Sequence, residues 1–134
     1  MKEREKTPPL SDAQREIMNI VWDNEEVGVA EVWRILSDRR SVARNTVLTL
    51  ITRLVDKGWL QPRRVGNAFR YTAARPREKA QSEEIRRLVN TVFDGSAEGL
   101  VMSLLEGGSL SPEESQRIRA MIMKASRKDR REKP

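Results

Sequence analysis

The sequence predicts a mainly α-helical fold with one small β-hairpin between two groups of three helices. Apolar residues recur at the i, i+3, i+4, i+7 spacing of one helical face in the segments before and after the hairpin. Between these groups the period changes, and the stretches on either side of Gly66-Asn67 have the composition of strands. Gly66-Asn67 is a turn-forming pair, so the change of period predicts a hairpin there.

Length and composition limit the classes of protein that fit. The chain has 134 residues, enough for one domain or two small ones, and it is 37% hydrophobic and 34% charged. No apolar run approaches the roughly 20 residues that cross a bilayer, and residues 1–9 lack the apolar segment of a secretion signal. We expect a cytoplasmic protein without membrane insertion, in which residues 1–9 form a disordered tail.

Cysteine and histidine are both absent. Thiolate and imidazole supply many nucleophiles, many metal ligands and most acid–base chemistry near neutral pH. The acids that remain have the sequence context of ordinary helix surfaces. We therefore expect no enzyme activity, no catalytic residue, no cofactor and no metal site.

Residues 10–40 predict two helices joined by a short extended link. The first helix begins at Ser11, which forms a capping-box pattern with Gln14. The link lies at residues 27–29, and the second helix occupies residues 30–38. The expected buried stripes are Ala13, Ile17, Ile20 and Val21 with Trp22 at the edge, and then Val29, Val32, Trp33 and Leu36.

Residues 41–57 predict a third helix with two unlike faces. Ser41 is the expected cap, and Gly58 suits the position after a helix C-terminus. The inner face is Val47, Leu50, Ile51, Leu54 and Val55, and the outer face is Arg44, Asn45, Leu48, Thr49 and Thr52. The outer face has no acid, and its short polar side chains suit base edges in a DNA major groove. For this helix considered alone, an ordinary core helix with a solvated outer face is the more common case among globular proteins.

The stretches at residues 59–65 and 68–73 predict the two strands of the hairpin. Leu60, Phe69 and Tyr71 are the expected inward residues, and Pro62 belongs on a strand edge that faces solvent. Three helices followed by a basic two-stranded hairpin make a winged helix-turn-helix, which we place at residues 10–75.

Positive charge is concentrated in this domain. Residues 39–75 contain nine basic residues and one acid, Asp56, so this segment has a net charge of +8. The whole chain has a net charge of +6, so the remaining residues sum to −2. A localised basic footprint is typical of binding to a phosphate backbone, whereas a merely solvated surface predicts dispersed charge. We expect double-stranded DNA as partner, with base contacts from Arg44, Asn45, Thr46, Leu48 and Thr49, and backbone contacts from Ser41, Thr52, Arg53, Arg63, Arg64 and Arg70.

Residues 76–126 predict three further helices, each apolar on one side only. Their stripes are Ile85, Leu88, Val89, Val92 and Phe93, then Leu100, Val101, Leu104 and Leu105, then Ile118, Met121 and Ile122. So few residues do not close a core alone. We expect them to form a homodimerisation domain, which places two recognition helices on a palindrome. The alternative is a monomer in which they pack on residues 10–75, and residues 127–134 are expected to form a disordered basic tail.

Several short motifs fall in the order of a known family. They are Leu10-Ser11, Val21-Trp22, the run TLITRL at residues 49–54, Lys57-Gly58, Tyr71, and Phe93-Asp94-Gly95-Ser96. Over about residues 10–124 the chain resembles the BlaI/MecI family of penicillinase repressors. This resemblance implies a cytoplasmic, homodimeric transcriptional repressor that binds a palindromic operator.

The resemblance also implies a route by which repression is relieved. In several members a membrane-bound sensor peptidase leads to cleavage within the dimerisation region, which matches Ser103 and Leu104 here. The better-known members have Asn-Phe at that place, and some relatives have a long polar or basic residue in place of Leu48. Copper-responsive relatives bind metal through cysteines, which this chain lacks.

A second function class fits the same residues. A winged helix can dock on another protein or bind nucleic acid without sequence preference through its basic face. Such a protein-interaction or non-specific module would have no palindromic site.

Overall fold

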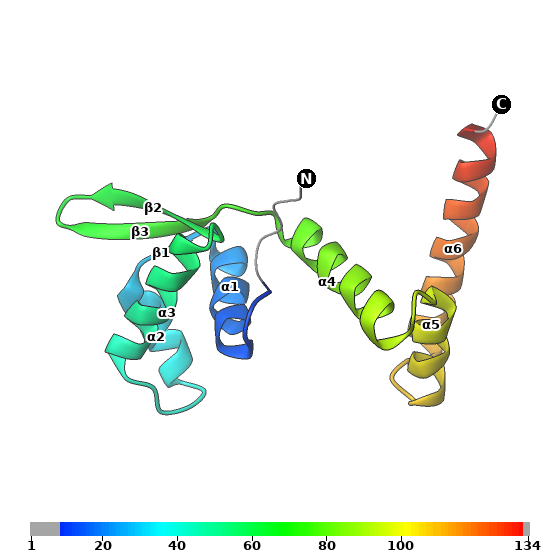
Figure 1. The fold of residues 1–134 in the computed structure, drawn as a ribbon, viewed down its shortest axis with the longest axis horizontal. Helices are drawn as coiled ribbons and strands as arrows, with labels where there is room; N and C mark the ends of the chain where they lie inside the picture. Colours follow the sequence, from blue (N-terminus) through cyan, green and yellow to red (C-terminus); the bar gives the residue numbers. More distant parts are fainter. Residues whose placement is uncertain (1–8, 133–134) are drawn as a thin grey trace. The chain divides into compact units, whose positions relative to one another are not determined.

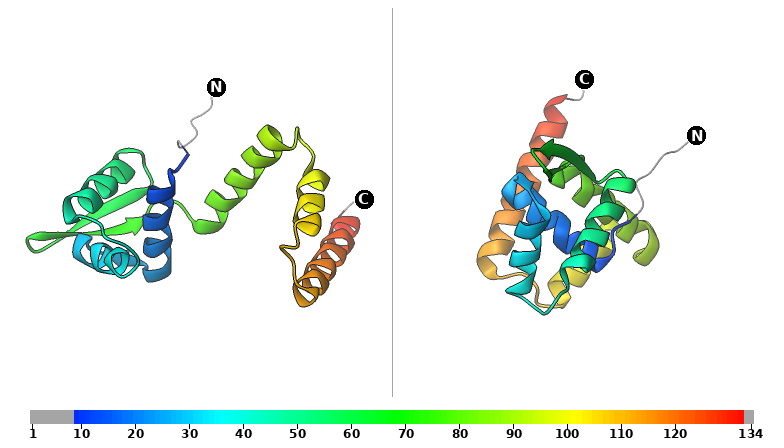
Figure 2. Two further views of the ribbon diagram at one scale, coloured as in Figure 1. Left: turned by 90° about the horizontal axis from the view of Figure 1, so that it is seen from below. Right: turned by 90° about the vertical axis from the view of Figure 1, so that its left-hand side faces the viewer.

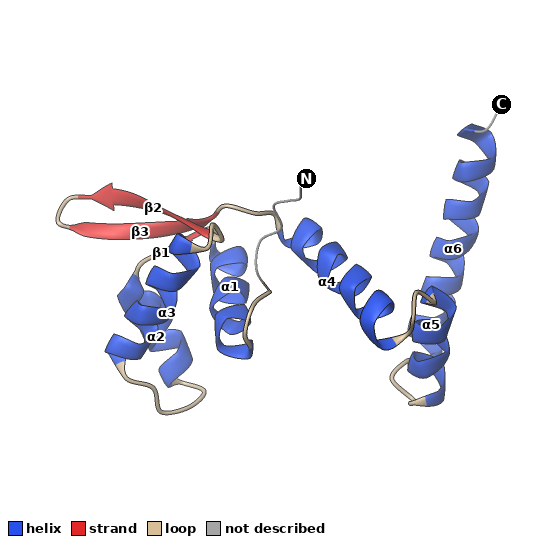
Figure 3. Cartoon of the chain, in the orientation of Figure 1, coloured by secondary structure: helices blue, strands red, loops and turns tan. Residues whose placement is uncertain are grey.

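The computed structural model describes residues 9–132, and the side chains of residues 9–128. The helices are α1 (Asp12–Asn24), α2 (Val29–Ser37), α3 (Arg44–Asp56), α4 (Arg77–Val92), α5 (Ala97–Glu106) and α6 (Pro112–Glu132). The strands are β1 (Glu26–Val27), β2 (Leu60–Val65) and β3 (Ala68–Ala73). The order of elements is that of a winged helix followed by three helices, as predicted (Figures 1 and 3). Of the tails predicted at residues 1–9 and 127–134, residues 1–8 and 133–134 lie outside the described residues.

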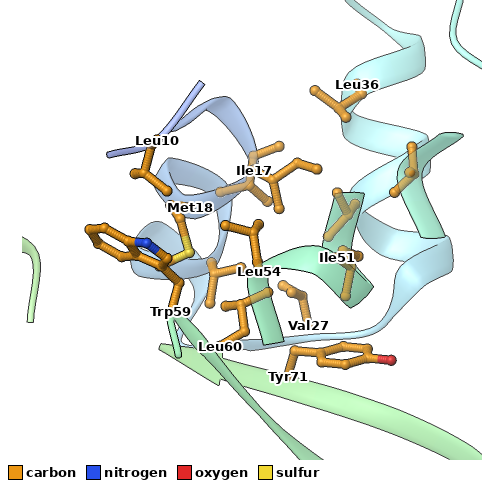
Figure 4. Close-up of a cluster of buried hydrophobic side chains, with 14 of the residues drawn as sticks. Leu10, Ile17, Met18, Val27, Leu36, Ile51, Leu54, Trp59, Leu60 and Tyr71 are labelled. Carbon is orange, nitrogen blue, oxygen red and sulfur yellow. The ribbon is translucent and has the colours of Figure 1, made fainter. Parts of the chain in front are cut away.

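The chain divides into two compact units, one ending at Glu84 and the other beginning at Ile85. The first unit has a closed core, in which α1, α2 and α3 meet the sheet (Figure 4). Its fully buried side chains are Ile17, Met18, Val21, Val27, Val32, Leu36, Val47, Ile51 and Leu54. Burying each of the larger ones stabilises the fold by about 1.5–3 kcal/mol relative to exposure. Trp59, Leu60 and Tyr71 cover this core from the sheet side.

The start of α1 has the predicted capping box. The Ser11 hydroxyl accepts a hydrogen bond from the Gln14 backbone at 3.2 Å, and the Gln14 side chain accepts one from the Ser11 backbone at 2.9 Å. The bond from the Ser11 backbone satisfies the side-chain carbonyl of Gln14, so this polar side chain is buried without loss of a hydrogen bond. Met18 is buried on the same helix. Ala13, predicted in the stripe, is only half-buried.

The prediction that Ser41 caps α3 is wrong. The cap residue is Ala43, which makes no side-chain hydrogen bond, and the helix begins at Arg44. The preceding backbone is held extended because the Trp33 indole N–H donates to the Val42 carbonyl at 2.9 Å and Val42 packs against the core. At the other end Gly58 has a φ of 86°, the left-handed conformation expected after a helix C-terminus.

The sheet has the order β1-β3-β2 and is antiparallel throughout. Its edge strand β2 carries Pro62, as predicted. Phe69 was predicted to point into the core, but its side chain is 48% exposed. The tip of the hairpin projects beyond the helices (Figure 2), and Phe69 lies close to that tip as the second residue of β3.

The change from the first compact unit to the second falls within α4, whereas the sequence predicts a boundary at residue 76. The first turns of this helix belong to the first unit, where Ala80 is 4% exposed. The Arg75 guanidinium bonds Glu83 at 2.7 Å, and the Trp22 indole donates to the Arg75 carbonyl at 2.9 Å. The Arg77 guanidinium of α4 also lies over the half-buried Trp22 ring, 5.4 Å from its centroid.

The second unit has no buried side chain among its described residues. The apolar stripes of α4, α5 and α6 are half-exposed or exposed, and Val92 reaches 64%. Residues 127–132 were predicted to be disordered, but α6 continues to Glu132. The reason is that Arg, Lys and Glu are good helix formers and no glycine or proline interrupts this stretch before Pro134.

Candidate nucleic-acid interface

The outer face of α3 is exposed and free of acids over its first turns. Arg44, Asn45, Thr46, Leu48 and Thr49 are all exposed, as are Ser41 before the helix and Thr52 and Arg53 on it. A shallow hollow of about 270 Å³ follows this face and is lined by Asn45, Thr46, Thr49, Leu50 and Arg53. The hollow offers hydroxyl, amide and guanidinium groups, which are the donors and acceptors that read base edges.

The N-terminus of α3 adds to the positive potential. Neither a side-chain cap nor an acid in the first turn neutralises the helix dipole there, and Arg44 occupies the first helical position. Such an end leaves backbone N–H groups available to an anion.

A second hollow, of about 460 Å³, lies between the start of α3 and the hairpin. Its lining includes Arg44 and Leu48 of α3 and Val65 and Phe69 of the hairpin. Leu48, Val65 and Phe69 are also the large apolar side chains that the described part of the first unit exposes. The Arg64 guanidinium lies over the Phe69 ring, 5.8 Å from its centroid. This side of the unit therefore combines exposed apolar and cationic groups.

Several of the basic residues between positions 39 and 75 are held in ion pairs with acids. Ion pairs hold Arg39 and Arg40 to Glu16, Arg63 and Arg70 to Glu26, Arg70 also to Glu31, and Arg75 to Glu83. Within the described residues, Arg44, Arg53, Lys57 and Arg64 have no such acidic partner. Counting charges along residues 39–75 missed these acids because all four lie elsewhere in the sequence.

The acids in these pairs have lowered pKa values. Hydrogen bonds from Arg63, at 2.9 Å to each carboxylate oxygen, are the main reason that the pKa of Glu26 lies below its ordinary 4.5. The pKa of Arg63 is raised by the same pair. The pKa of Glu31 is lowered mainly by the hydrogen bond from the Gly28 N–H and to a smaller extent by Arg70. The pKa of Glu16 is lowered mainly by Arg40 and to a smaller extent by Arg39. All these groups are charged at neutral pH.

The other predicted site residues lie in the second unit. The predicted dimerisation residues form the apolar stripes of α4, α5 and α6, together with Phe93 just after α4. Ser103 and Leu104 lie within α5, where both are exposed. Across the described residues, no cluster of acids has the arrangement of a metal site, and no helix is long and apolar enough to cross a membrane.

Together, the fold and the exposed face of α3 define a winged-helix DNA-binding protein. The sequence model of the family described as "Penicillinase repressor" matches residues 10–124. A penicillinase repressor of Bacillus licheniformis is 29% identical over 109 residues, covering 81% of this chain and 85% of that protein. The methicillin resistance regulatory protein MecI of Mammaliicoccus sciuri is 27% identical over 119 residues, covering 89% of this chain and 97% of that protein.

Solved structures agree with this relationship. The DNA-binding domain of the repressor BlaI, determined in solution, is 31% identical, with a TM-score of 0.50 over 55% of this chain and 90% of that chain. A mutant MarR of E. coli has the same TM-score at 17% identity, over 87% of this chain and 77% of that chain, which is a likeness of fold.

The chain belongs to the penicillinase repressor, or BlaI/MecI, family. The predicted family and the predicted winged helix-turn-helix are thereby confirmed. The family is one of DNA-binding transcriptional repressors rather than enzymes.

Proposed function

We propose that this protein represses transcription as a cytoplasmic homodimer that binds a palindromic DNA operator. The observation that carries the proposal is the acid-free, exposed outer face of α3, flanked by cations that have no acidic partner in the described part of the chain. A helix of this kind fits the major groove, with short side chains against base edges and guanidinium groups against phosphates.

The roles of individual residues follow from their chemistry. Asn45, Thr46 and Thr49 offer hydrogen bonds to bases, Arg44 suits a guanine, and the exposed Leu48 side chain suits a thymine methyl group. Ser41, Thr52 and Arg53 lie at the margins of this face, where they suit phosphates and not bases. Arg64 suits a phosphate from the hairpin.

The exposed stripes of α4, α5 and α6 support the homodimer. A single chain leaves Ile85, Val92, Leu105 and Met121 at least half exposed. Large apolar side chains that are exposed in this number are typical of an interface. A second copy of the same helices would cover it with matching surface and form a two-fold pair.

Relief of repression by proteolysis rests on the family resemblance. A membrane-bound sensor peptidase would act on the bond between Ser103 and Leu104, in an exposed stretch of α5. Cleavage there would remove α6 from the dimer. Co-expression with a candidate sensor peptidase and its inducer should yield a fragment that ends at Ser103, and an intact chain would contradict this route.

The proposal is tested by selecting binders from random duplexes with the purified full chain. We expect an enriched site with two inverted half-sites about one helical turn apart. Thr49→Ala should reduce the ratio of specific to non-specific affinity, whereas Arg64→Ala should weaken binding to all duplexes about equally. Enrichment of no sequence would favour a protein-docking or non-specific module, and identical behaviour of the two variants would refute the assigned roles.

A further inference from the structure

The two faces of the β2–β3 hairpin carry different charges. Arg64 and Phe69 lie opposite each other on the face that continues from Tyr71 and the core. Arg63 and Arg70 are paired on the other face. Two like charges directly opposite in a ladder are destabilising, so this pair needs a compensating acid.

Glu26 of β1 supplies that acid. Its carboxylate accepts two hydrogen bonds from Arg63, both 2.9 Å, and lies 3.4 Å from Nε of Arg70. Arg70 also donates to the Glu26 carbonyl at 3.1 Å and to the Glu31 carboxylate at 2.9 Å. Two-point bonding of a guanidinium to a carboxylate has the geometry with which arginine also grips a phosphate.

The Glu31 carboxylate is itself fixed. Its Oε1 atom accepts the Gly28 N–H at 2.8 Å at the start of α2, as well as the Arg70 guanidinium. Arg70 therefore connects the hairpin to β1 and α2. By contrast, among the described residues Arg64 has no acidic partner, and it bonds the Gly66 carbonyl at 3.3 Å besides its contact with Phe69.

We propose that Glu26 is a specificity-determining residue: it holds Arg63 and Arg70 in place of a DNA phosphate, which leaves Arg64 as the phosphate ligand of the wing. This inference rests on the proposed function and revises the equal roles expected for the three arginines. Phosphate contacts raise affinity for every sequence. An internal carboxylate that occupies two arginines therefore lowers non-specific affinity and raises the ratio of specific to non-specific binding.

The test is a salt titration of full-length protein binding to a fluorescent duplex of arbitrary sequence. Glu26→Gln keeps the size of the side chain and removes its charge. The matched control is Asp23→Asn, which changes the net charge equally but frees Arg77 of α4, whose guanidinium it bonds at 2.6 Å, and no arginine of the hairpin. Tryptophan fluorescence confirms that each variant is folded.

Glu26→Gln should bind the duplex about tenfold more tightly at low salt. Its plot of log affinity against log salt should be steeper by about 0.9 for each arginine released. Adding Arg63→Gln to this variant should return part of that slope, and Glu26→Asp should behave like the wild type. In the wild-type background, Arg63→Gln should leave the slope unchanged, while Arg64→Gln should reduce it by about 0.9 per chain.

The inference is overturned if the salt slope of Glu26→Gln equals that of Asp23→Asn, or if Glu26→Gln binds the duplex more weakly than the wild type. Either result leaves DNA binding by the wild type intact. A reduced slope for Arg63→Gln alone also overturns the inference, and this readout remains if Glu26→Gln does not fold. Wild-type protein that fails to bind any duplex overturns the proposed function itself.

Discussion

The two units of this chain use the same sequence pattern with opposite results. In the first unit, Ile17 of α1 and Ile51 of α3 are completely buried. In the second unit, Ile85 of α4 and Ile122 of α6 stand at equivalent helical spacing but are 50% and 57% exposed. The period of a stripe tells which face of a helix is apolar, and it does not tell where the covering surface comes from.

The difference has a structural cause. In the first unit a three-stranded sheet and three helices approach from different directions, so every stripe meets another (Figure 4). As far as the structure describes it, the second unit has no sheet, and its helices are too few to surround a core. The first unit thus closes its core within a single chain, and the second unit is expected to depend on a second copy.

The largest expected effect that tests this comparison is on the core of the first unit. Ile51→Ala should lower the free energy of unfolding by about 2–5 kcal/mol because it opens a cavity in close-packed surroundings. The measurement is urea denaturation followed by tryptophan fluorescence, which reports on the first unit because it contains Trp22, Trp33 and Trp59, all the tryptophans of the chain. Ile122→Ala, the control, should change this transition by less than about 0.5 kcal/mol. Equal losses would show that the two stripes belong to one core.

The next effect is on association through the second unit. Val92→Glu places a charge in the exposed stripe of α4 and should raise the dimer dissociation constant at least about a hundredfold, or about 2.8 kcal/mol. Sedimentation velocity over a range of concentrations measures this change. Asn90→Glu adds the same charge on another face of α4 and should leave the dimer intact. A wild-type protein that stays monomeric at all concentrations would refute the expected dependence on a second copy.

The boundary between the units gives a smaller effect. Ala80→Asp puts a carboxylate where the native side chain is 4% exposed, and it should destabilise the first unit by about 1–3 kcal/mol. Ser82→Asp, at an exposed position two residues later, is the control and should have little effect. The same tryptophan-detected unfolding measures both. Similar curves for the two variants would restore the boundary to residue 76.

The smallest expected effect is that of pH on the first unit. The pKa values of Glu16, Glu26 and Glu31 are lower in the fold than their ordinary 4.5, so each carboxylate stabilises the fold above that pH. This contribution is lost as the pH falls below 4.5 and each group takes up a proton. The melting temperature, followed by tryptophan fluorescence, should therefore drop in this range, and less so at high salt because the pairs are partly exposed. Glu16→Gln should reduce the drop, and a melting temperature that rises on acidification would contradict the assignment.

Local features of the fold were predictable from the sequence. The capping box at Ser11, the turn at Gly66-Asn67 and the end of α3 before Gly58 depend on residues close together in the chain. The inner face of α3 was also predictable, because a helical period fixes which side chains share a face. The predictions for Ser41 and Phe69 were wrong because tertiary contacts decide both positions. The Trp33 side chain bonds the backbone before α3, and the hairpin tip that carries Phe69 extends beyond the helices.

By itself, the sequence determined the helices, the hairpin, the basic character of residues 39–75 and the exposed face of α3, because these follow from periodicity, turn chemistry and local charge. Only the tertiary structure decided which of those charges are free. Glu16, Glu26, Glu31 and Glu83 reach the basic residues through contacts between separate elements. A count of charges along a segment treats every arginine as a free cation. An arginine that is bonded to a carboxylate from another element no longer acts as one.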